Sequence, residues 1–149
     1  MLEIRSARVE DKESIQGIYV SAVGIEAGTD EAQWDRSIHS GGLLVAHVSD
    51  RIIGFGGIDV NAREQVRWLY LLPSHQGAGI GSQLLRRLEE IGWKAGLNLL
   101  RLHSAPAAIE FYRRHGYQAV EPTELIGHDH DGLEMVKGPP PVATLRTES

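Results

Sequence analysis

Apolar positions in the first forty residues recur first at strand spacing and then at helical spacing. Residues 3–9 predict a short strand, and Asp11 offers an N-cap for the helix that follows it. The apolar face of that helix comprises Ile15, Ile18, Tyr19, Ala22 and Val23. A second short helix, with Thr29 and Asp30 as candidate caps, is expected to end at residues 41–42, which are both glycine.

The middle of the chain carries alternating apolar runs separated by turn residues. Residues 43–48 and 52–60 predict a hairpin closed by the polar turn at 49–51, and residues 64–72 predict a third strand. Three consecutive strands with short connections indicate an antiparallel meander.

Helical and strand patterns then alternate toward the C-terminus. Apolar residues from Ile80 to Ala95 recur every three or four positions, which predicts a helix of about sixteen residues that ends at Gly96. Residues 97–103 predict a buried strand, and Pro106 suits the first turn of a helix that ends at Gly116. The last strands are expected at 117–125 and 133–137.

This order predicts one mixed α/β sheet, mostly antiparallel and flanked by helices. A single domain is expected over residues 1–138. Residues 139–149 begin with three prolines and are otherwise mostly polar, so we expect an extended or disordered tail.

Composition narrows the possible functions. The 149 residues include no cysteine, which excludes a disulfide framework, a thiolate zinc site and a cysteine nucleophile. A net charge of −5 argues against nucleic acid as a partner, and no apolar run approaches the ~20 residues of a membrane helix. Charged residues near the N-terminus do not fit a signal peptide, so a cytoplasmic location is expected.

The segment Gln76–Gly81, QGAGIG, lies between a predicted strand and a predicted helix. Glycines at a helix start let a phosphate approach the unpaired amides and the positive end of the helix dipole. A nucleoside-triphosphate loop is excluded because no lysine lies between Lys12 and Lys94, and the glycine spacing departs from the dinucleotide fingerprint. The glycines alone leave a turn without a ligand as an open alternative.

Two segments together carry a family resemblance. Residues 69–85 resemble the acetyl-CoA motif of the GCN5-related N-acetyltransferases, Gln or Arg-x-x-Gly-x-Gly or Ala, which Gln76, Gly79 and Gly81 match. Residues 108–117, AIEFYRRHGY, resemble the second block of the same family, Ala-x-x-Phe-Tyr-x-x-x-Gly-Phe or Tyr. Both motifs stand in the family order, and the predicted elements suit that fold from about residue 2 to residue 137.

The resemblance implies acetyl-CoA as a co-substrate, bound where the strands ending at Leu72 and near His103 splay apart. Backbone amides of 76–82 would hold the pyrophosphate, and residues 69–71 would pair with the pantetheine arm like an added strand. The implied cofactor-binding residues are Leu69, Leu71, Gln76, Gly77, Ala78, Gly79, Ile80, Gly81 and Ser82.

Tyr112 matches the family tyrosine that protonates the departing CoA sulfur; its alternative is a packing role beside Phe111. This chain departs from the family pattern at the position where relatives often have an asparagine that contacts pantetheine. Here that position is Ala105, and Ser104 is a candidate substitute.

The general base is left open between several residues. Many relatives carry a glutamate where this chain has Gln65, which cannot accept a proton, so the catalytic candidate is Glu64. Glu64 would need a β-bulge or a relaying water to face the acceptor, because adjacent strand residues point to opposite faces. Asp59 and His103 are further candidates, and some members of the family need no dedicated base.

Three other features have a functional and a simpler interpretation. Residues 128–131, HDHD, look like metal ligands, but no third ligand accompanies them at suitable spacing, so no metal is expected. Trp34 is a core residue or an acceptor contact. Arg113 and Arg114 are solvated, or one of them approaches a CoA phosphate.

Taken together, the residues and the resemblance predict an acetyl-CoA-dependent N-acetyltransferase. The acceptor would be a primary amine of a small molecule or peptide that attacks directly in a ternary complex, because no cysteine can carry the acetyl group. Transfer of a longer acyl group, a non-catalytic acyl-CoA-binding module and a structural domain are the alternatives. The resemblance also makes a homodimer possible.

Overall fold

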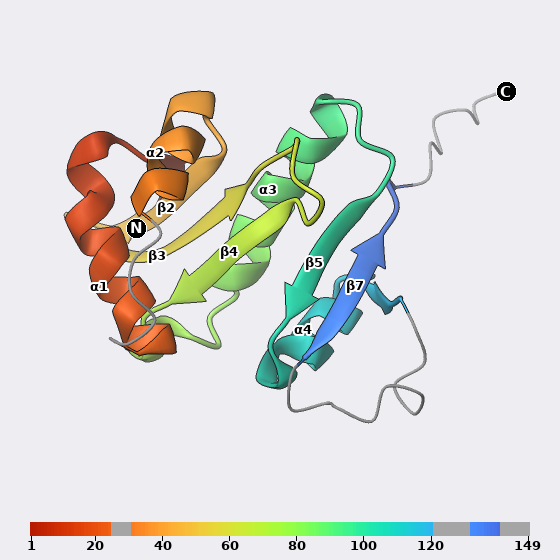
Figure 1. Ribbon diagram of the computed structural model, residues 1–149. Helices are drawn as coiled ribbons and strands as arrows, with labels where there is room; N and C mark the ends of the chain where they lie inside the picture. The colour runs from red at the N-terminus through yellow and green to blue at the C-terminus, as the bar shows by residue number, and fades with distance from the viewer. Residues whose placement is uncertain (25–30, 121–131, 141–149) are drawn as a thin grey trace, which may run out of the picture.

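The computed structural model describes residues 1–24, 31–120 and 132–140 (Figure 1). The N-terminal part consists of β1 (Leu2–Ser6), a 3₁₀ turn at Val9–Asp11, α1 (Lys12–Val23) and α2 (Glu31–Ser40). The first strand is shorter than predicted. The candidate caps Thr29 and Asp30 of α2 lie outside the described residues.

The central part is a four-stranded antiparallel sheet in the order β1-β2-β3-β4. Its further strands are β2 (Leu43–Val48), β3 (Arg51–Ile58) and β4 (Val66–Leu71), which confirms the predicted meander. Helices α1 and α2 cover one face of this sheet, and α3 (Ile80–Lys94) packs against the other.

The remaining strands form a second antiparallel sheet in the order β5-β7-β6. It consists of β5 (Leu100–Ser104), β6 (Gln118–Ala119) and β7 (Leu133–Lys137), and α4 (Ile109–Arg114) follows β5 after a 3₁₀ turn. The prediction of one continuous sheet was wrong, because no ladder joins β4 to β5 within the described ranges. The mixed α/β class with helix-flanked antiparallel strands is confirmed.

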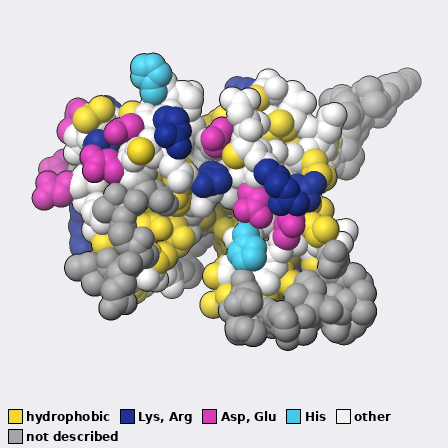
Figure 2. Space-filling view, in the orientation of Figure 1, with side chains coloured by type: hydrophobic (Ala, Val, Ile, Leu, Met, Phe, Trp, Pro, Cys, Tyr) yellow, Lys and Arg dark blue, Asp and Glu magenta, His cyan; other side chains and the backbone are white. Residues whose placement is uncertain are grey.

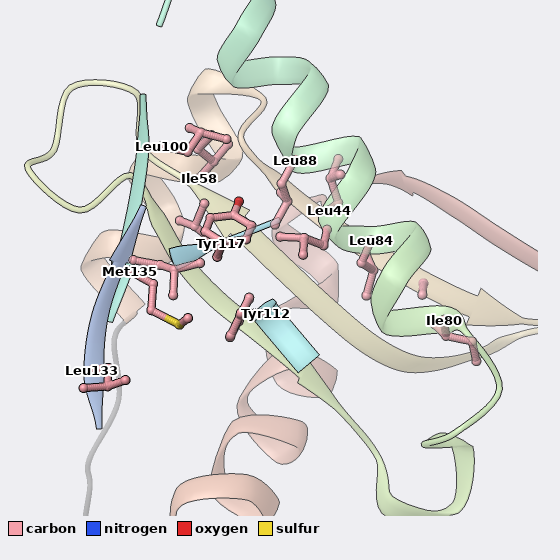
Figure 3. Packing of buried hydrophobic residues seen from close by; sticks show 14 of the residues in the cluster. Leu44, Ile58, Ile80, Leu84, Leu88, Leu100, Tyr112, Tyr117, Leu133 and Met135 are labelled. Atoms are coloured by element: carbon pink, nitrogen blue, oxygen red, sulfur yellow. The ribbon is translucent and has the colours of Figure 1, made fainter. Parts of the chain in front are cut away.

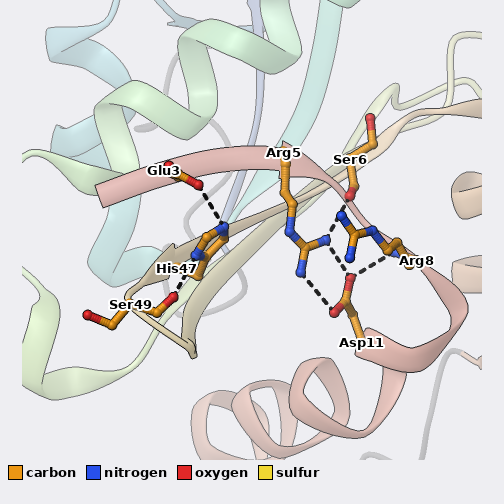
Figure 4. A network of polar contacts seen from close by, with 7 residues as sticks. All are labelled: Glu3, Arg5, Ser6, Arg8, Asp11, His47 and Ser49. Carbon is orange, nitrogen blue, oxygen red and sulfur yellow. Dashed lines mark hydrogen bonds and ion pairs between the residues drawn. The ribbon is translucent and has the colours of Figure 1, made fainter. Parts of the chain in front are cut away.

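The sequence suggested that the Asp11 side chain caps α1. In the structure it makes no capping hydrogen bond to that helix. Its carboxylate instead accepts hydrogen bonds from the Arg8 amide at 2.8 Å and from the Arg5 guanidinium at 2.8 and 3.1 Å (Figure 4). Hydrogen bonding to Arg5 is the main cause that lowers the pKa of Asp11. This bidentate pair fastens β1 to the turn that leads into α1.

Two apolar cores lie on the two faces of the four-stranded sheet. On the α1 and α2 face, Trp34 packs edge-on against Phe55 and Trp68. On the α3 face, Leu84 and Leu88 belong to a core that also includes Leu100 and Met135 of the second sheet (Figure 3). The second core therefore joins the two sheets although no strand ladder does.

Strand β4 contains a bulge that changes which face its residues occupy. Gly57 pairs with Trp68 and Ile58 pairs with Val66, so Arg67 is the extra residue. Val66 belongs to the α3-side core, whereas Trp68 belongs to the opposite core, although strict alternation would put both on one face. The bulge thus changes which face of the sheet the β4 residues occupy on the way to the glycine loop.

Candidate active site

A cleft of about 450 Å³ opens between β4, the glycine loop, the start of α3 and α4. It borders the place where β4 and β5 have no ladder between them. Its lining residues are Leu69, Leu71, Gln76, Gly77, Gly79, Gly81, Ser82, Ala107, Ala108, Phe111, Tyr112 and Arg114.

The backbone of the loop has the conformation that its glycines permit. Gly77 and Gly79 have φ of 86° and 82°, and Gly79 is the left-handed N-cap of α3. The first hydrogen bond of α3 runs from the Gln83 amide to the Gly79 carbonyl at 3.2 Å. The amides of residues 80–82 therefore precede the ladder of the helix and remain available for an anion.

Two side-chain contacts fix the shape of this end of the cleft. The Gln76 side-chain amide donates to the Leu71 carbonyl at 3.4 Å, and the Ser82 hydroxyl lies 2.8 Å from Nε2 of His115. A Cβ atom at Gly81 would lie 3.5 Å from the Phe111 ring, in ordinary contact. The loop is thus tied to both β4 and the end of α4.

Seven of the nine predicted cofactor-binding residues line the cleft, and two do not. Ile80 points into the core with 6% of its surface exposed, and Ala78 is exposed and does not line the cleft. Sequence reasoning did not assign Ala107, Ala108 or Phe111 to the cofactor, although the second motif contains two of them.

The two arginines of α4 are separated by the structure. Arg114 lines the cleft, whereas Arg113 donates to Glu110 at 2.7 Å and lies outside it. The helical rotation between neighbouring residues puts them on different sides of α4. Arg114 is therefore the one that can reach a phosphate in the cleft.

Tyr112 lies at the inner end of the cleft with 9% of its surface exposed. Its ring packs edge-on against that of Phe111, with the centroids 5.2 Å apart. It packs likewise against the ring of Tyr117, with the centroids 5.6 Å apart (Figure 3). Burial, with a smaller contribution from Tyr70, raises the pKa of Tyr112 well above its ordinary value. Tyr112 therefore both packs beside Phe111 and lines the cleft. Its phenol stays protonated at neutral pH.

A narrow passage leads from the cleft between β4 and β5. This cavity of about 110 Å³ shares Leu69, Ala108 and Tyr112 with the cleft. On its other side it shares Arg67, Tyr70 and further residues with a third cavity. The molecule is accordingly hollowed between its two halves (Figure 2).

The third cavity, of about 200 Å³, lies toward α1 and is called the acceptor-side pocket below. It is lined by Tyr19, Glu64, Val66, Arg67, Trp68, Tyr70 and His103. The passage thus lies between the glycine-lined cleft and a pocket of aromatic and charged residues, and it shares lining residues with both.

The structure brings two of the three candidate bases together. Glu64 and His103 both line the acceptor-side pocket, although Glu64 comes from the connection before β4 and His103 from β5. Asp59 lines none of these three cavities, and its carboxylate accepts a hydrogen bond from the Asn61 amide at 3.0 Å. A bulge is present close to Glu64, as that candidate required, and Glu64 itself lies in the bend before β4.

Gln65, which occupies the position of the family glutamate, has a structural contact. Its side-chain oxygen accepts a hydrogen bond from the Arg101 amide at 2.9 Å, which bridges the start of β4 to β5. Near the other end of β5, Ser104 is buried and donates to the Ala105 carbonyl at 2.8 Å. Ala105 lines the passage and Ser104 does not, so Ser104 does not supply the missing asparagine contact from its present position.

Trp34 is 1% exposed and packs among aromatic rings, which supports its interpretation as a core residue. It lines none of the three cavities of the site. The possible metal ligands at 128–131 lie outside the described residues. In the described ranges, no helix combines the length and apolarity that crossing a membrane requires.

Comparisons with known proteins agree with the two motifs. The family model described as an acetyltransferase (GNAT) domain matches residues 39–119, more than half of the chain. The chain is 31% identical over 101 residues to an IAA acetyltransferase of Azospirillum brasilense, covering 64% of this chain and 66% of that protein. It is 30% identical over 67 residues to the uncharacterized N-acetyltransferase YjcF of Bacillus subtilis, covering 45% and 48%.

These matches span about half to two thirds of the curated relatives. Among solved structures, the chain resembles the PaiA N-acetyltransferase of Thermoplasma acidophilum in complex with coenzyme A, with a TM-score of 0.70 and 22% identity. That match covers 93% of this chain and 99% of the other, and it supports the fold. The chain belongs to the GCN5-related N-acetyltransferase (GNAT) family.

Proposed function

We propose that the protein transfers the acetyl group of acetyl-CoA to a primary amine by direct attack in a ternary complex. The observation that carries this proposal is the passage beside Tyr112, which shares lining residues with both the glycine-lined cleft and the acceptor-side pocket. A thioester in the cleft and an amine in the pocket would meet there without either leaving its own site.

The cleft suits the cofactor in three respects. Amides of residues 80–82 at the start of α3 offer donors to the pyrophosphate. Leu69 and Leu71 on β4 offer an apolar wall and strand edge to the pantetheine arm. Arg114 offers a cation to a phosphate at the outer end. Bound acetyl-CoA would supply the activated acetyl group.

The chemistry requires one proton to leave the amine and one to reach the sulfur. The amine nitrogen attacks the thioester carbonyl, and the C–S bond breaks as the C–N bond forms. Tyr112 donates its hydroxyl proton toward the departing thiolate and regains a proton from the solvent-connected passage. Burial keeps the phenol protonated at neutral pH but also makes it a weaker acid, so transfer to the sulfur depends on the position of the hydroxyl beside the leaving thiolate.

On the acceptor side, Glu64 and His103 both line the pocket, and this supports the proposal that one of them receives the proton that the amine loses. One of them acts directly or through a water, since both line the same pocket. Asp59 is not part of this proposal, because its carboxylate belongs to the turn after β3.

The test compares Tyr112→Phe with a matched control, Tyr117→Phe. Both tyrosines are buried in the same core, but the Tyr117 hydroxyl donates to Glu89 at 2.9 Å and lines none of the three cavities. Thiol release from acetyl-CoA with an amine panel measures transfer, and the thermal shift with CoA measures binding. Removing a positioned acid typically slows turnover by about 10²- to 10⁴-fold.

We expect Tyr112→Phe to lose turnover and to keep the CoA shift, while Tyr117→Phe loses stability and keeps turnover. Full turnover in Tyr112→Phe would refute the role of Tyr112. A CoA shift without transfer to any amine by the wild type would instead favour the acyl-CoA-binding module, for which Ala105 and the displaced glutamate, with Gln65 in its place, are the motivating departures. No shift with CoA or acetyl-CoA would refute the cofactor site itself.

A further inference from the structure

Arg67 is the extra residue of the β4 bulge and lines both the passage and the acceptor-side pocket. Its Nη2 donates to the neutral side-chain oxygen of Gln33 on α2 at 2.6 Å. Its guanidinium carbon also lies 5.8 Å from the centre of the Trp68 ring. The bulge, the amide and the indole together orient this cation at the mouth of the pocket.

Other charges beside the pocket are paired with one another. Glu134 accepts from Arg101 at 2.8 Å and lies 3.2 Å from Arg63, which is 3.9 Å from Glu64. Both acidic and basic side chains are visible around the hollow between the two halves (Figure 2). Within residues 1–24, 31–120 and 132–140, no carboxylate forms a salt bridge with Arg67.

Among the described residues, the positive charge of Arg67 is therefore not paired with a carboxylate where the acceptor would enter. A guanidinium has five N–H donors, and the bond to Gln33 uses one of them. The remaining donors suit a carboxylate, which arginine binds in a bidentate manner. Because Gln33 and Trp68 already restrict the side chain, binding would cost little additional side-chain entropy.

We propose that the acceptor is a small amine that also carries a carboxylate, as a free amino acid does, and that Arg67 binds this carboxylate. This inference rests on the proposed function and adds the substrate class. Glu64 and His103 line the same pocket and would face the amino group, so the site would present opposite charges to the two ends of the acceptor. A pocket of about 200 Å³ fits a molecule of that size.

The first experiment offers the wild-type protein matched pairs of acceptors, each an amino acid and its carboxamide. The panel covers the common amino acids and also β-alanine with its amide, which vary the distance between the two groups. Rates are compared at equal concentrations of the free-base amine, because an amide lowers the pKa of the neighbouring amino group. We expect the acids to be used about ten- to a hundredfold better than their amides, the effect of a charge-assisted hydrogen bond.

The second experiment repeats the preferred pair with Arg67→Gln, Arg67→Glu and a control, Arg51→Gln. Arg51 is an exposed arginine at the start of β3 that lines none of the three cavities. The ratio of the rate with the acid to the rate with its amide should fall to about one in Arg67→Gln and below one in Arg67→Glu. This change should arise from KM for the acid. The ratio should stay at the wild-type value in Arg51→Gln. Equal use of acids and amides by the wild type, or an unchanged ratio in Arg67→Gln, would overturn the inference.

A binding measurement separates this inference from the proposed function. Protein saturated with CoA is titrated calorimetrically with each acid and each amide, so no transfer is needed. Binding of an acid that is lost in Arg67→Gln supports the inference even without turnover. Absence of acid binding overturns it, while the CoA shift recorded on the same sample shows that the cofactor site is intact.

Discussion

The cluster formed by Glu89, Lys137 and Tyr117 offers a sharp test of how the two sheets are held together. Glu89 on α3 accepts from Lys137 of β7 at 3.0 and 3.2 Å and from the Tyr117 hydroxyl at 2.9 Å. The Glu89 side chain is 9% exposed and that of Lys137 is 24% exposed. This carboxylate therefore connects the helix of the first sheet to a strand of the second.

Lys137→Met keeps most of the apolar length of the side chain and removes only the charge. Glu89 then stays buried with Tyr117 as its single remaining partner among these contacts. Breaking a fully buried pair from one side costs about 3 to 5 kcal/mol. Because a quarter of Lys137 is exposed, we expect a loss of about 2 to 4 kcal/mol, or about 5 to 15 °C in Tm.

Urea unfolding followed by tryptophan fluorescence measures this loss, since Trp34 and Trp68 are buried in the native state. The matched variant is Glu89→Gln with Lys137→Met, which removes the unpaired charge but retains an acceptor for Tyr117. The double variant should be more stable than Lys137→Met alone by about 2 kcal/mol. No recovery in the double variant would refute the argument that an uncompensated buried charge causes the loss.

Two further predictions concern the glycine loop and the N-terminal pair. Gly79→Ala and the control Gly96→Ala should each lower the free energy of unfolding by about 1 to 2 kcal/mol, because the φ values of these glycines are 82° and 92°. Only Gly79→Ala should weaken the CoA-induced thermal shift. Equal CoA affinity in both variants would contradict the assigned role of the loop. Asp11→Asn should lose about 1 to 2 kcal/mol at pH 7, since Arg5 lowers the folded-state pKa of Asp11 below its ordinary value of 3.8. The stability difference between wild type and Asp11→Asn should therefore be complete well above pH 3.8 and should shrink as the pH falls through the folded-state pKa of Asp11. Urea unfolding from pH 7 to pH 3 measures this difference. A difference that does not change with pH would show that the charge of Asp11 is not its source.

Local sequence signals were sufficient for most of the elements. The apolar periodicity of residues 80–95 and the turn at residues 49–51 depend on neighbours in the chain, and the structure has α3 and the β2–β3 hairpin there. The division into two sheets was missed, because pairing between β4 and β5 is decided by residues distant in sequence. Gln65 illustrates this, since its side chain contacts the Arg101 amide.

In the candidate site, too, some features follow from neighbours in the chain and others from residues distant in sequence. The glycine loop could be recognised because positive φ values restrict which residues are tolerated, so the requirement is written in the sequence. The bulge at Arg67 left no comparable signal, and it decides which residues of β4 face the acceptor-side pocket. Glu64 was a candidate because it adjoins the position of the family glutamate, and His103 and Asp59 were further candidates by residue type. Only the shared pocket distinguishes Glu64 and His103 from Asp59.

The sequence by itself determined the family and the glycine loop of this protein, because both depend on short-range spacing of glycine, glutamine and aromatic residues. Tertiary structure alone decided the burial that raises the pKa of Tyr112 and the passage beside it. It also left Arg67 without a salt bridge in the described part of the chain while pairing Arg63 and Arg101. Burial and charge compensation depend on which distant residues meet in space, and those meetings cannot be read from neighbours along the chain.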